Sequence, residues 1–517
     1  MKSGKRFDIL PSFTSSQSGF RDISDPNSSF QNSDVVGDAS VGVRYGISSN
    51  TSLEGTINPD FSQVESDAGQ IDVNNQFALF FPEKRPFFQE GSDLLNSFFS
   101  LVYTRSINDP SFATKLTSRS NKLSYAYIGA VDERSPLIIP GEEGNNIVQN
   151  LGKSYSNILR VRRSFREDSH VGAFIIDRRV VGGGSGSILS IDSNIRFKKV
   201  YNFELQGVFS NTAEVNDTTL TEGLNQTVFD NDGHTVGLDG ESYTGNAVHA
   251  SITRRSRGLF YNLNYQHISP SYRADNGFQT ANNRRFGLFN ANYSIYPDNS
   301  YIDRIRTGLF VFRMWNFDGQ IKNNALRGDL LVDLKGQTSL FAQYGIGPET
   351  FRGRKFNDQW TAFFRVNSNY LDEIGFSAYF FRGLLIARFS DPIQNGDITN
   401  YGFSATIKPI DRLVIEPNLD IFKLVTVETK DISEGYIFRT RADYQFTKEL
   451  FVRLVVQYND FNRRLDLEPL LTYKINPFSQ FFIGSTHGSF DDASNRGLNF
   501  VQADRQYFMK FQYLFRI

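Results

Sequence analysis

The chain has 517 residues, 39% of them hydrophobic and 14% aromatic, and its 55 Lys and Arg residues balance 56 Asp and Glu residues. The balanced charge argues against a nucleic-acid-binding protein, which normally carries a basic excess. The absence of cysteine excludes disulfide scaffolds and thiolate metal sites, and the absence of any run of about 18 apolar residues excludes a transmembrane helix.

The N-terminal residues Met1–Arg6 are basic, but no apolar stretch follows them. We therefore recognise no signal peptide in the sequence as it stands. A cytoplasmic protein and the C-terminal piece of a secreted protein would both begin in this way, so the rest of the chain has to distinguish between them.

Alternation of apolar and polar residues with a period of two dominates the chain and predicts β-strands whose two faces differ. The clearest examples, in chain order, are the segments 189–198, 259–266, 401–408, 436–446 and 450–459. The C-terminal segment follows the same rule, and we expect it to close a barrel with one face toward lipid. The residues of that face are Tyr507, Met509, Phe511, Tyr513, Phe515 and Ile517.

The connections between these segments alternate between short turns and long polar loops, and the long loops are 132–151, 211–242, 269–284 and 489–506. Strands of about ten residues joined in this way are typical of an outer-membrane β-barrel. We predict an all-β fold in which residues 1–517 form one antiparallel transmembrane barrel of about 24 strands, within a range of roughly 20 to 26.

Two features of the pattern bear on this prediction. The short turns fall consistently on one side, so an even strand count requires that only one of the segments 6–14 and 98–105 lies in the wall. A soluble propeller or a pair of sandwiches is the alternative fold, but we find no repeat of about 40 to 50 residues. The dense aromatic residues near strand ends also favour a membrane barrel.

The segment 58–95 breaks the alternation, and it contains three prolines, clustered phenylalanines and charges of both signs. A wide barrel has a lumen that needs filling, so we expect this segment to fold inward as a plug. The alternative is an Ω-loop that packs on itself outside the lumen. The charged residues expected to pair within the plug or with the wall are Asp60, Glu65, Asp67, Glu83, Lys84, Arg85 and Glu90.

A weak calcium motif lies in the second long loop. The residues Asp230 and Asp232 resemble the first half of a calcium-binding loop, and Glu241 stands where the twelfth-position carboxylate would fall. No flanking helices are evident, and a polar turn rich in Asp, Asn and Gly is the simpler interpretation.

The sequence predicts no catalytic residue and no cofactor. None of the five histidines has the spacing of a metal-binding pair. Ser485, His487 and Asp491 form the one cluster of nucleophile, base and acid, but such a motif without known geometry is weak evidence for a hydrolase.

Two stretches of the chain resemble a known family. The run NPDFSQVESDAGQ, followed by FFPEKRPFFQEGSDLL, and the ending DRQYFMKFQYLFRI are similar to a Bacteroidota outer-membrane barrel family defined by the domain of unknown function DUF5916. Members usually carry a signal peptide and a module similar to family-9 carbohydrate-binding modules, and neither is found in this sequence. The resemblance implies outer-membrane placement and a weak link to glycans.

We therefore expect a non-enzymatic integral protein of the Gram-negative outer membrane, in contact with membrane lipid and lipopolysaccharide and with possible envelope protein partners. The leading functional hypothesis is a channel or receptor with an occluded lumen, for an envelope or glycan-related substrate. The alternatives are a structural or accessory subunit that transports nothing and, with less support, an outer-membrane hydrolase.

Overall fold

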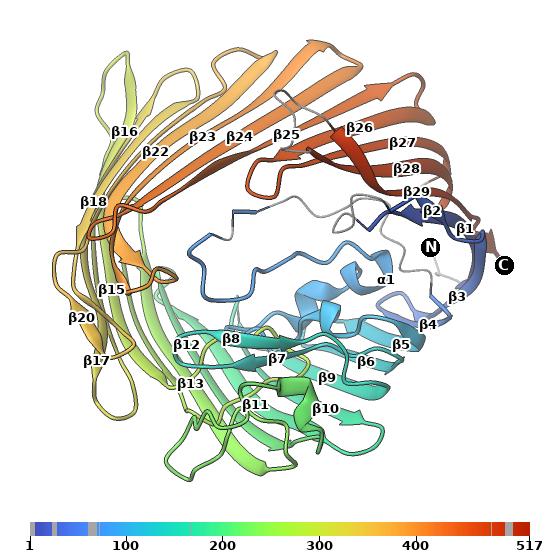
Figure 1. Ribbon diagram of the computed structural model, residues 1–517, viewed down its shortest axis with the longest axis horizontal. Helices are drawn as coiled ribbons and strands as arrows, with labels where there is room; N and C mark the ends of the chain where they lie inside the picture. The colour runs from blue at the N-terminus through green and yellow to red at the C-terminus, as the bar shows by residue number, and fades with distance from the viewer. Residues whose placement is uncertain are drawn as a thin grey trace.

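The computed structural model describes residues 6–22, 28–59, 70–71, 73–166, 168–476, 478–491 and 500–517. Within these residues, 24 strands form the wall of one closed antiparallel barrel, seen down its axis in Figure 1. The wall strands are β1 (Arg6–Phe20), β3 (Val36–Ser48), β4 (Thr51–Ile57), β5 (Pro110–Arg119), β6 (Leu123–Asp132), β9 (Ser154–Ser164), β10 (His170–Val180), β11 (Ser185–Phe197), β12 (Tyr201–Ala213), β13 (Ser242–Arg255), β14 (Leu259–Ile268), β15 (Arg284–Ile295), β16 (Ile302–Trp315), β17 (Ile321–Leu334), β18 (Thr338–Ile346), β21 (Trp360–Ser368), β22 (Ile374–Ala387), β23 (Gln394–Ile410), β24 (Leu413–Thr426), β25 (Ile432–Gln445), β26 (Leu450–Asn459), β27 (Arg464–Asn476), β28 (Ser479–Asp491) and β29 (Phe500–Gln512).

The ring closes between the first and last wall strands. Strand β1 pairs with β3 along one edge and with β29 along the other, from Ser12 opposite Gln512 to Phe20 opposite Asp504. The short strand β30 (Phe515–Arg516) continues the C-terminal pairing along β1. The predicted barrel of about 24 strands is therefore confirmed, and of the two N-terminal candidates the segment 6–14 lies in the wall whereas 98–105 does not.

The two ends of the barrel differ. At one end, which we call the turn end, neighbouring strands are joined by short turns such as 120–122 and 335–337. At the other, the loop end, the connections are longer and contain further short elements. These are β2 (Gln31–Asn32), the hairpin β7 (Leu137–Pro140) and β8 (Asn145–Val148), the hairpin β19 (Glu349–Phe351) and β20 (Arg354–Phe356), and the 3-10 helix η3 (Thr218–Thr221).

One predicted boundary is wrong. The sequence placed residues 489–506 in a loop, but β28 runs to Asp491 and β29 already begins at Phe500. This part of β29 still pairs with β28, but a register shift between Gln502 and Asp504 interrupts the alternation of faces. The backbone pairing continues on both sides of this irregularity, so the strand persists where the period-two signal is interrupted.

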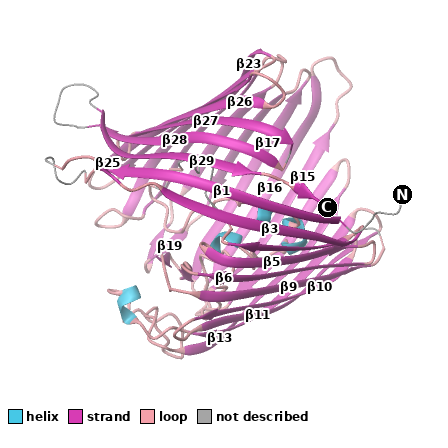
Figure 2. Ribbon diagram, turned by 90° about the vertical axis from the view of Figure 1, so that its right-hand side faces the viewer, coloured by secondary structure: helices cyan, strands magenta, loops and turns pink. Residues whose placement is uncertain are grey.

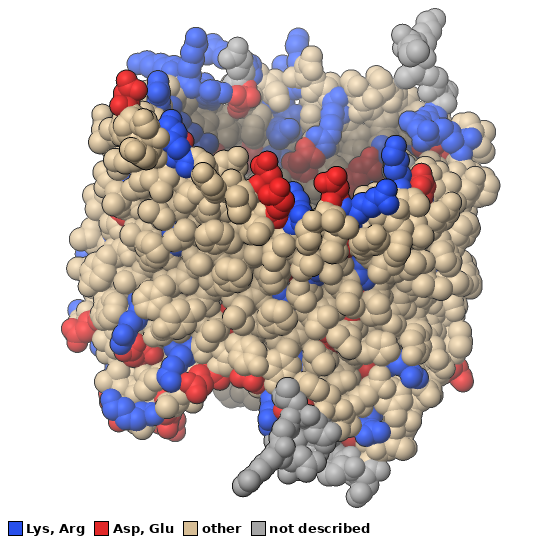
Figure 3. Space-filling view, turned by 90° about the horizontal axis from the view of Figure 1, so that it is seen from above, with Lys and Arg blue, Asp and Glu red and all other residues tan. Residues whose placement is uncertain are grey.

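The two faces of the wall have different side chains. In the C-terminal segment, the six residues expected to face lipid have exposed fractions of 36–77%, whereas the intervening Lys510 is 8% exposed. In a side view of the wall, charged residues gather mainly at two rims and the band between them holds few, as Figure 3 shows. An uncharged band of this kind between two polar rims is typical of the outer surface of a transmembrane barrel.

Three short helices interrupt the connection between β4 and β5: α1 (Pro86–Gln89), η1 (Ser92–Leu95) and η2 (Thr104–Ser106). Figure 2 shows helical turns behind the front wall of tilted strands. Among the described residues, no helix has the length and apolar character needed to cross a membrane.

Candidate functional site

The described part of the long connection between β4 and β5 lies inside the ring of wall strands, as the blue trace in Figure 1 shows. It leaves the wall at the loop end after Ile57 and returns there at Pro110. We call its described residues 70–71 and 73–109 the inner segment. The sequence predicted a special segment at 58–95, and the structure extends it to Asp109 because 98–105 does not join the wall.

The inner segment touches the wall at β22–β24. Ile71 and Val73 pack against an apolar cluster of wall and loop residues formed by Phe381, Leu385, Ala387, Ile398, Phe422, Leu424 and Phe461. The amide of Asn74 donates to the carbonyl of Ile386 at 2.9 Å and accepts from the backbone N–H of Arg388 at 2.7 Å. This contact fixes the start of the inner segment at the loop end of β22.

The rest of the inner segment packs on another arc of the wall. Its buried residues are Phe88, Leu94, Leu95, Phe99, Leu101 and Ile107. Their partners come from β5, β6 and β9–β13, and several are small: Ala113, Ala126, Ala130 and Ala247. Small inward side chains leave the space that phenylalanine and leucine side chains of the segment fill, so this arc of the barrel carries an apolar core.

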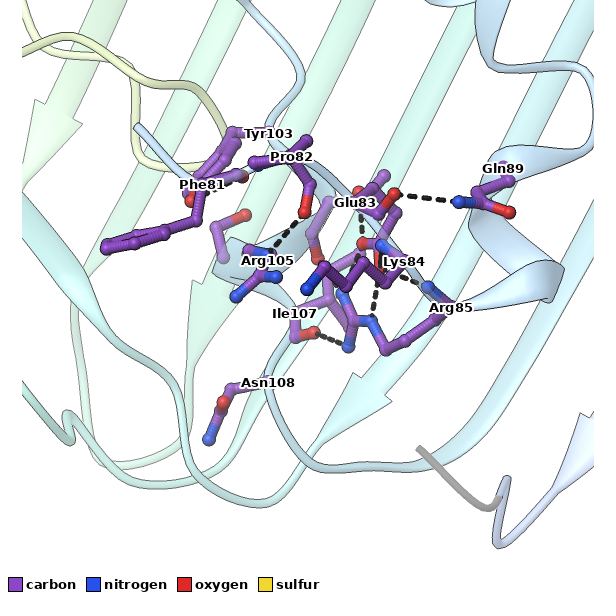
Figure 4. Close-up of polar contacts among 12 residues, drawn as sticks. Phe81, Pro82, Glu83, Lys84, Arg85, Gln89, Tyr103, Arg105, Ile107 and Asn108 are labelled. Carbon is purple, nitrogen blue, oxygen red and sulfur yellow. Dashed lines mark hydrogen bonds and ion pairs between the residues drawn. The ribbon is translucent and has the colours of Figure 1, made fainter. Parts of the chain in front are cut away.

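An ion pair between Glu83 and the buried Arg85 organises the centre of the inner segment (Figure 4). Arg85 is 7% exposed, and its guanidinium contacts both carboxylate oxygens of Glu83 at 2.7 and 2.8 Å. The same guanidinium donates to the carbonyls of Thr104 and Ile107, each at 2.7 Å. Arg85 therefore joins the outgoing and returning halves of the segment.

Glu83 is also satisfied by several donors besides the guanidinium. It accepts from the backbone N–H groups of Lys84 and Arg85 and from the Thr104 hydroxyl, at 3.0, 2.8 and 2.5 Å respectively. Burial by itself would raise the pKa of Glu83, but the hydrogen bonds and charge of Arg85 outweigh it and hold the pKa below its ordinary value.

Charged residues of the wall anchor the turn following α1. Lys115 of β5 is 2% exposed, donates to the carbonyl of Glu90 at 3.0 Å, and pairs with Glu54 of β4 at 3.0 Å. The carboxylate of Glu90 pairs with Arg44 of β3 at 2.6 Å. Deeper toward the turn end, Asp93 forms a two-pronged ion pair with Arg119 of β5.

The loop between β14 and β15 covers the returning half of the inner segment. The backbone N–H of Tyr103 donates to Asn276 at 2.7 Å, and that of Phe278 donates to Ser100 at 2.9 Å. The rings of Phe80, Tyr103 and Phe278 lie in mutual contact, with centroids 5.0–5.3 Å apart. The inner segment is thus held from the wall and from a loop of the loop end.

The predicted ion-pair residues divide into two groups. Glu83, Arg85 and Glu90 take part in the ion pairs described above, and Lys84 donates its backbone N–H to Glu83. Asp60, Glu65 and Asp67 lie outside the described residues. Sequence reasoning missed the wall partners Arg44, Glu54, Lys115 and Arg119, although charges on the inward parity of β3–β5 are a signal that could have identified them.

The candidate calcium residues are distributed over two groups. Asp230 and Asp232 lie together with His234, and the Asp230 carboxylate accepts from the ring of His234 at 2.7 Å. Glu241 lies instead beside Glu214 and Asp239. Burial raises the pKa of Glu214 to about 7, even though Arg273 opposes this shift.

Part of the hydrolase cluster is brought together. The His487 Nε2 atom lies 3.0 Å from the Ser485 hydroxyl, because the two side chains share one face of β28. The other ring nitrogen lies 3.3 Å from the amide of Gln502, and Asp491 forms an ion pair with Arg463 at 3.0 Å. A Ser–His–Asp triad needs a carboxylate on that second nitrogen, and an amide does not stabilise the imidazolium in the same way.

A polar cavity of about 760 Å³ opens among the loop-end connections, next to the inner segment. Its lining includes Gln76 of the inner segment, acidic and basic side chains, and the aromatic residues Phe229, Phe317, Phe351 and Phe389. Glu142 and Glu143 form ion pairs there with Lys322 of β17. A mixture of aromatic rings and charged groups in one concave site is typical of small-molecule binding.

Solved structures with a similar fold are transporters and receptors. The ferric enterobactin receptor of Pseudomonas aeruginosa, bound to enterobactin, aligns over 100% of this chain and 82% of its own, at 10% identity and a TM-score of 0.51. The FrpB iron transporter of Neisseria meningitidis aligns over 78% and 80%, at 8% identity and a TM-score of 0.49. The siderophore receptor PirA of Pseudomonas aeruginosa aligns over 98% and 80%, at 8% identity and a TM-score of 0.48.

At such low sequence identity the similarity shows the fold alone. Of these three structures, the enterobactin receptor has a TM-score above 0.5. No curated protein matches the chain in sequence. The model of a domain of unknown function, DUF5916, matches residues 23–127, a range that includes β3–β5, the inner segment and the first part of β6. The resemblance noted from the sequence is confirmed over this range: residues 23–127 carry the domain of unknown function DUF5916.

Proposed function

We propose that this protein is an integral outer-membrane channel or receptor whose lumen is closed by the inner segment acting as a plug. The observation that carries the proposal is that the segment contacts β22–β24 through Ile71, Val73 and Asn74 and packs on β5–β13 through its buried residues. A chain held at both places extends across the interior of the ring (Figure 1). Passage of a solute then requires part of this segment to move.

The proposed direction of entry is from the loop end, where the polar cavity meets the inner segment at Gln76. A ligand bound there would touch both the loop-end connections and the segment that closes the lumen. The sequence resemblance to a family with a carbohydrate-binding-like module supports an envelope or glycan-related ligand. The uncharged band of the wall supports contact with membrane lipid, and the rim charges support contact with lipopolysaccharide phosphates.

A disulfide between the inner segment and the loop that follows β22 tests the channel proposal. The chain has no cysteine, so the pair Asn74→Cys and Arg388→Cys introduces the only thiols, at positions joined by a 2.7 Å hydrogen bond. Single-channel conductance is recorded in planar bilayers for the oxidised and reduced forms. The matched control is the Arg388→Cys protein alone, which cannot form an intramolecular disulfide.

Arg85→Ala should weaken the docking of the inner segment, so we expect channel openings in this variant. When Arg85→Ala is combined with the cysteine pair, oxidation should suppress these openings and reduction should restore them. If Arg85→Ala and the reduced double variant remain closed to ions and small sugars under all applied voltages, the channel proposal fails.

A specific observation favours the accessory-subunit alternative. The Glu54–Lys115 ion pair is buried and the Glu83–Arg85 ion pair is largely buried, as suits a permanent filling of the lumen. Hydrogen exchange distinguishes the two functions. Amides of the inner segment that exchange no faster than those of the wall strands, in the membrane-embedded protein, would support the accessory subunit and contradict a movable plug.

The hydrolase is the least supported function, and its geometric basis is the Ser485–His487 hydrogen bond. A Ser485→Ala variant that hydrolyses lipid or glycan substrates at the wild-type rate would remove this pair from consideration.

A further inference from the structure

The loop between β12 and β13 brings three carboxylates onto one face of a two-stranded ladder. The pairing of Ala213 with Ser242 continues beyond the wall: the backbone N–H of Glu214 donates to Glu241 at 2.9 Å, and Asn216 forms a bridge with Asp239. Residues opposite each other in an antiparallel pair, and residues two positions along, share one face. Glu214, Glu241 and Asp239 are therefore neighbours by register.

The side chains are as close as the register requires. One carboxylate oxygen from each of Glu214, Asp239 and Glu241 lies within 4.8 Å of the other two. Like charges placed directly opposite each other in a sheet destabilise it. The pairing of Glu214 with Glu241, with Asp239 beside them, therefore destabilises this ladder unless another interaction compensates for the repulsion.

Glu214 has an oxygen that is buried and unused. Its side chain is 1% exposed, and its Oε1 atom accepts from the Tyr243 hydroxyl at 2.8 Å and from Arg273 at 3.0 Å. Its Oε2 atom is buried and accepts no hydrogen bond. Leaving a carboxylate oxygen without a partner in a buried position is costly, so this atom itself points to a missing electropositive ligand.

The neighbouring arginine does not neutralise the group. Arg273 is shared between Glu214 and Asp275, whose carboxylate it contacts at 2.8 Å. Glu241 and Asp239 receive only neutral donors from Thr235: its backbone N–H lies 2.8 Å from Glu241, and its hydroxyl lies 3.4 Å from Asp239. One guanidinium thus faces four carboxylates, which leaves a net negative charge around the unused oxygen.

We propose that Glu214, Asp239 and Glu241 bind a divalent cation, and that the cation is Ca²⁺. The donors are all carboxylate oxygens, which hard cations prefer, and a loop that contributes ligands from both of its strands suits the flexible coordination of Ca²⁺. The proposed site differs from the sequence motif, since Asp230 and Asp232 belong to the separate group around His234.

The position of this site gives the cation a structural role. Leu238, which precedes Asp239, is fully buried in a cluster with Leu137, Ile139 and Val148 of the β7–β8 hairpin. Asn145 of the same hairpin accepts from the backbone N–H of Ala78 in the inner segment at 2.6 Å. A cation that holds the β12–β13 loop in place therefore also holds the β7–β8 hairpin, which contacts the inner segment.

Terbium luminescence tests the site directly. Tb³⁺ replaces Ca²⁺ in carboxylate sites, and the hydroxyl of Tyr243, 2.8 Å from Glu214, places a sensitising ring beside the proposed ion. The full-length protein, refolded in detergent without lipopolysaccharide and treated with a chelator, is titrated with Tb³⁺ under excitation of tyrosine. We expect saturable emission that Ca²⁺ displaces, and chymotrypsin cleavage within residues 214–241, at Phe229 or the leucines, that Ca²⁺ slows.

The variants Asp239→Asn and Glu241→Gln should each weaken binding by about tenfold or more, because calcium affinity depends on the number of ligand charges. The matched control is Asp232→Asn in the same loop, which should bind as the wild type does. The mobility shift on boiling in SDS verifies that each variant is folded.

Three outcomes would overturn the assignment. These are no displaceable emission from folded wild-type protein, equal affinity in the Glu241→Gln variant, or loss of binding in Asp232→Asn alone.

Discussion

Two arcs of the barrel present different inner surfaces. Beneath the inner segment, strands β5–β13 offer small or apolar side chains such as Ala126, Ile128 and Ala247, all buried. Along β25 and β26, the inward parity instead carries charges, as in the Arg441–Asp443–Arg453 ladder, whose side chains are 19–30% exposed. The wall beneath the inner segment is largely apolar with buried charges such as Lys115, whereas the wall along β25 and β26 carries partly exposed charges.

The ion pairs differ in the same way as the surfaces. Glu83 and Arg85 have side-chain exposures of 15% and 7%, and their contacts replace water almost entirely. Arg441 and Asp443 keep a larger share of their hydration. Breaking a buried pair leaves an uncompensated charge, whereas water compensates for the loss of an exposed one.

The largest expected effect tests this difference. Arg85→Ala should destabilise the docked inner segment by about 3–5 kcal/mol, because Glu83 is left buried without its partner. The control, Arg441→Ala on the charged arc, should cost about 1 kcal/mol or less. Protease susceptibility of residues 73–106, measured against denaturant, provides both values, and equal effects would show that the two arcs do not differ.

The second prediction compares the outer wall with the inner wall. We propose that the exposed face of the wall contacts lipid, and Leu454→Arg on that face of β26 should cost about 2–4 kcal/mol if it lies near the midplane. Gln457→Arg, on the inward parity of the same strand, should have little effect. Reversible folding into vesicles, followed by tryptophan fluorescence, measures both. Similar costs at both positions would contradict the assignment of faces.

The third prediction concerns the small residues beneath the inner segment. Ala247 is fully buried, so Ala247→Leu should overpack the contact and cost about 1–3 kcal/mol. The control Ser377→Leu lies in β22, outside the apolar core, and should be tolerated. The protease assay again compares the two, and an unaffected inner segment in Ala247→Leu would show that close packing there is unimportant.

The smallest effect is a pH dependence. The pKa of Glu83 lies below its ordinary value, so the ion pair stabilises docking at neutral pH, and this contribution is lost as the pH falls through the lowered pKa. We expect protection of the inner segment to decrease on acidification below the ordinary range of a glutamate. Glu83→Gln should remove that part of the profile, and an unchanged profile would assign the dependence to other carboxylates.

The sequence predicted the wall better than it predicted the interior. Alternation identified strands such as 436–446 and 450–459 because a membrane barrel requires one apolar face, and that requirement appears directly in residue order. The same signal failed at 500–506, where a register shift between Gln502 and Asp504 interrupts the alternation while the strand continues. Proline and the aromatic cluster marked 58–95 as different, but they did not show that the segment continues to Asp109.

What the sequence determined by itself is therefore the all-β class, the approximate strand number and the alternation of side chains between two faces. The tertiary structure alone decided the partners Arg44 and Lys115, the contact of Asn74 with β22, and the meeting of Glu214 with Glu241. The physical reason is the difference between local and long-range contacts along the chain. Face alternation is a local property of a strand, whereas closure of the ring brings together residues hundreds of positions apart, and no local pattern records that juxtaposition.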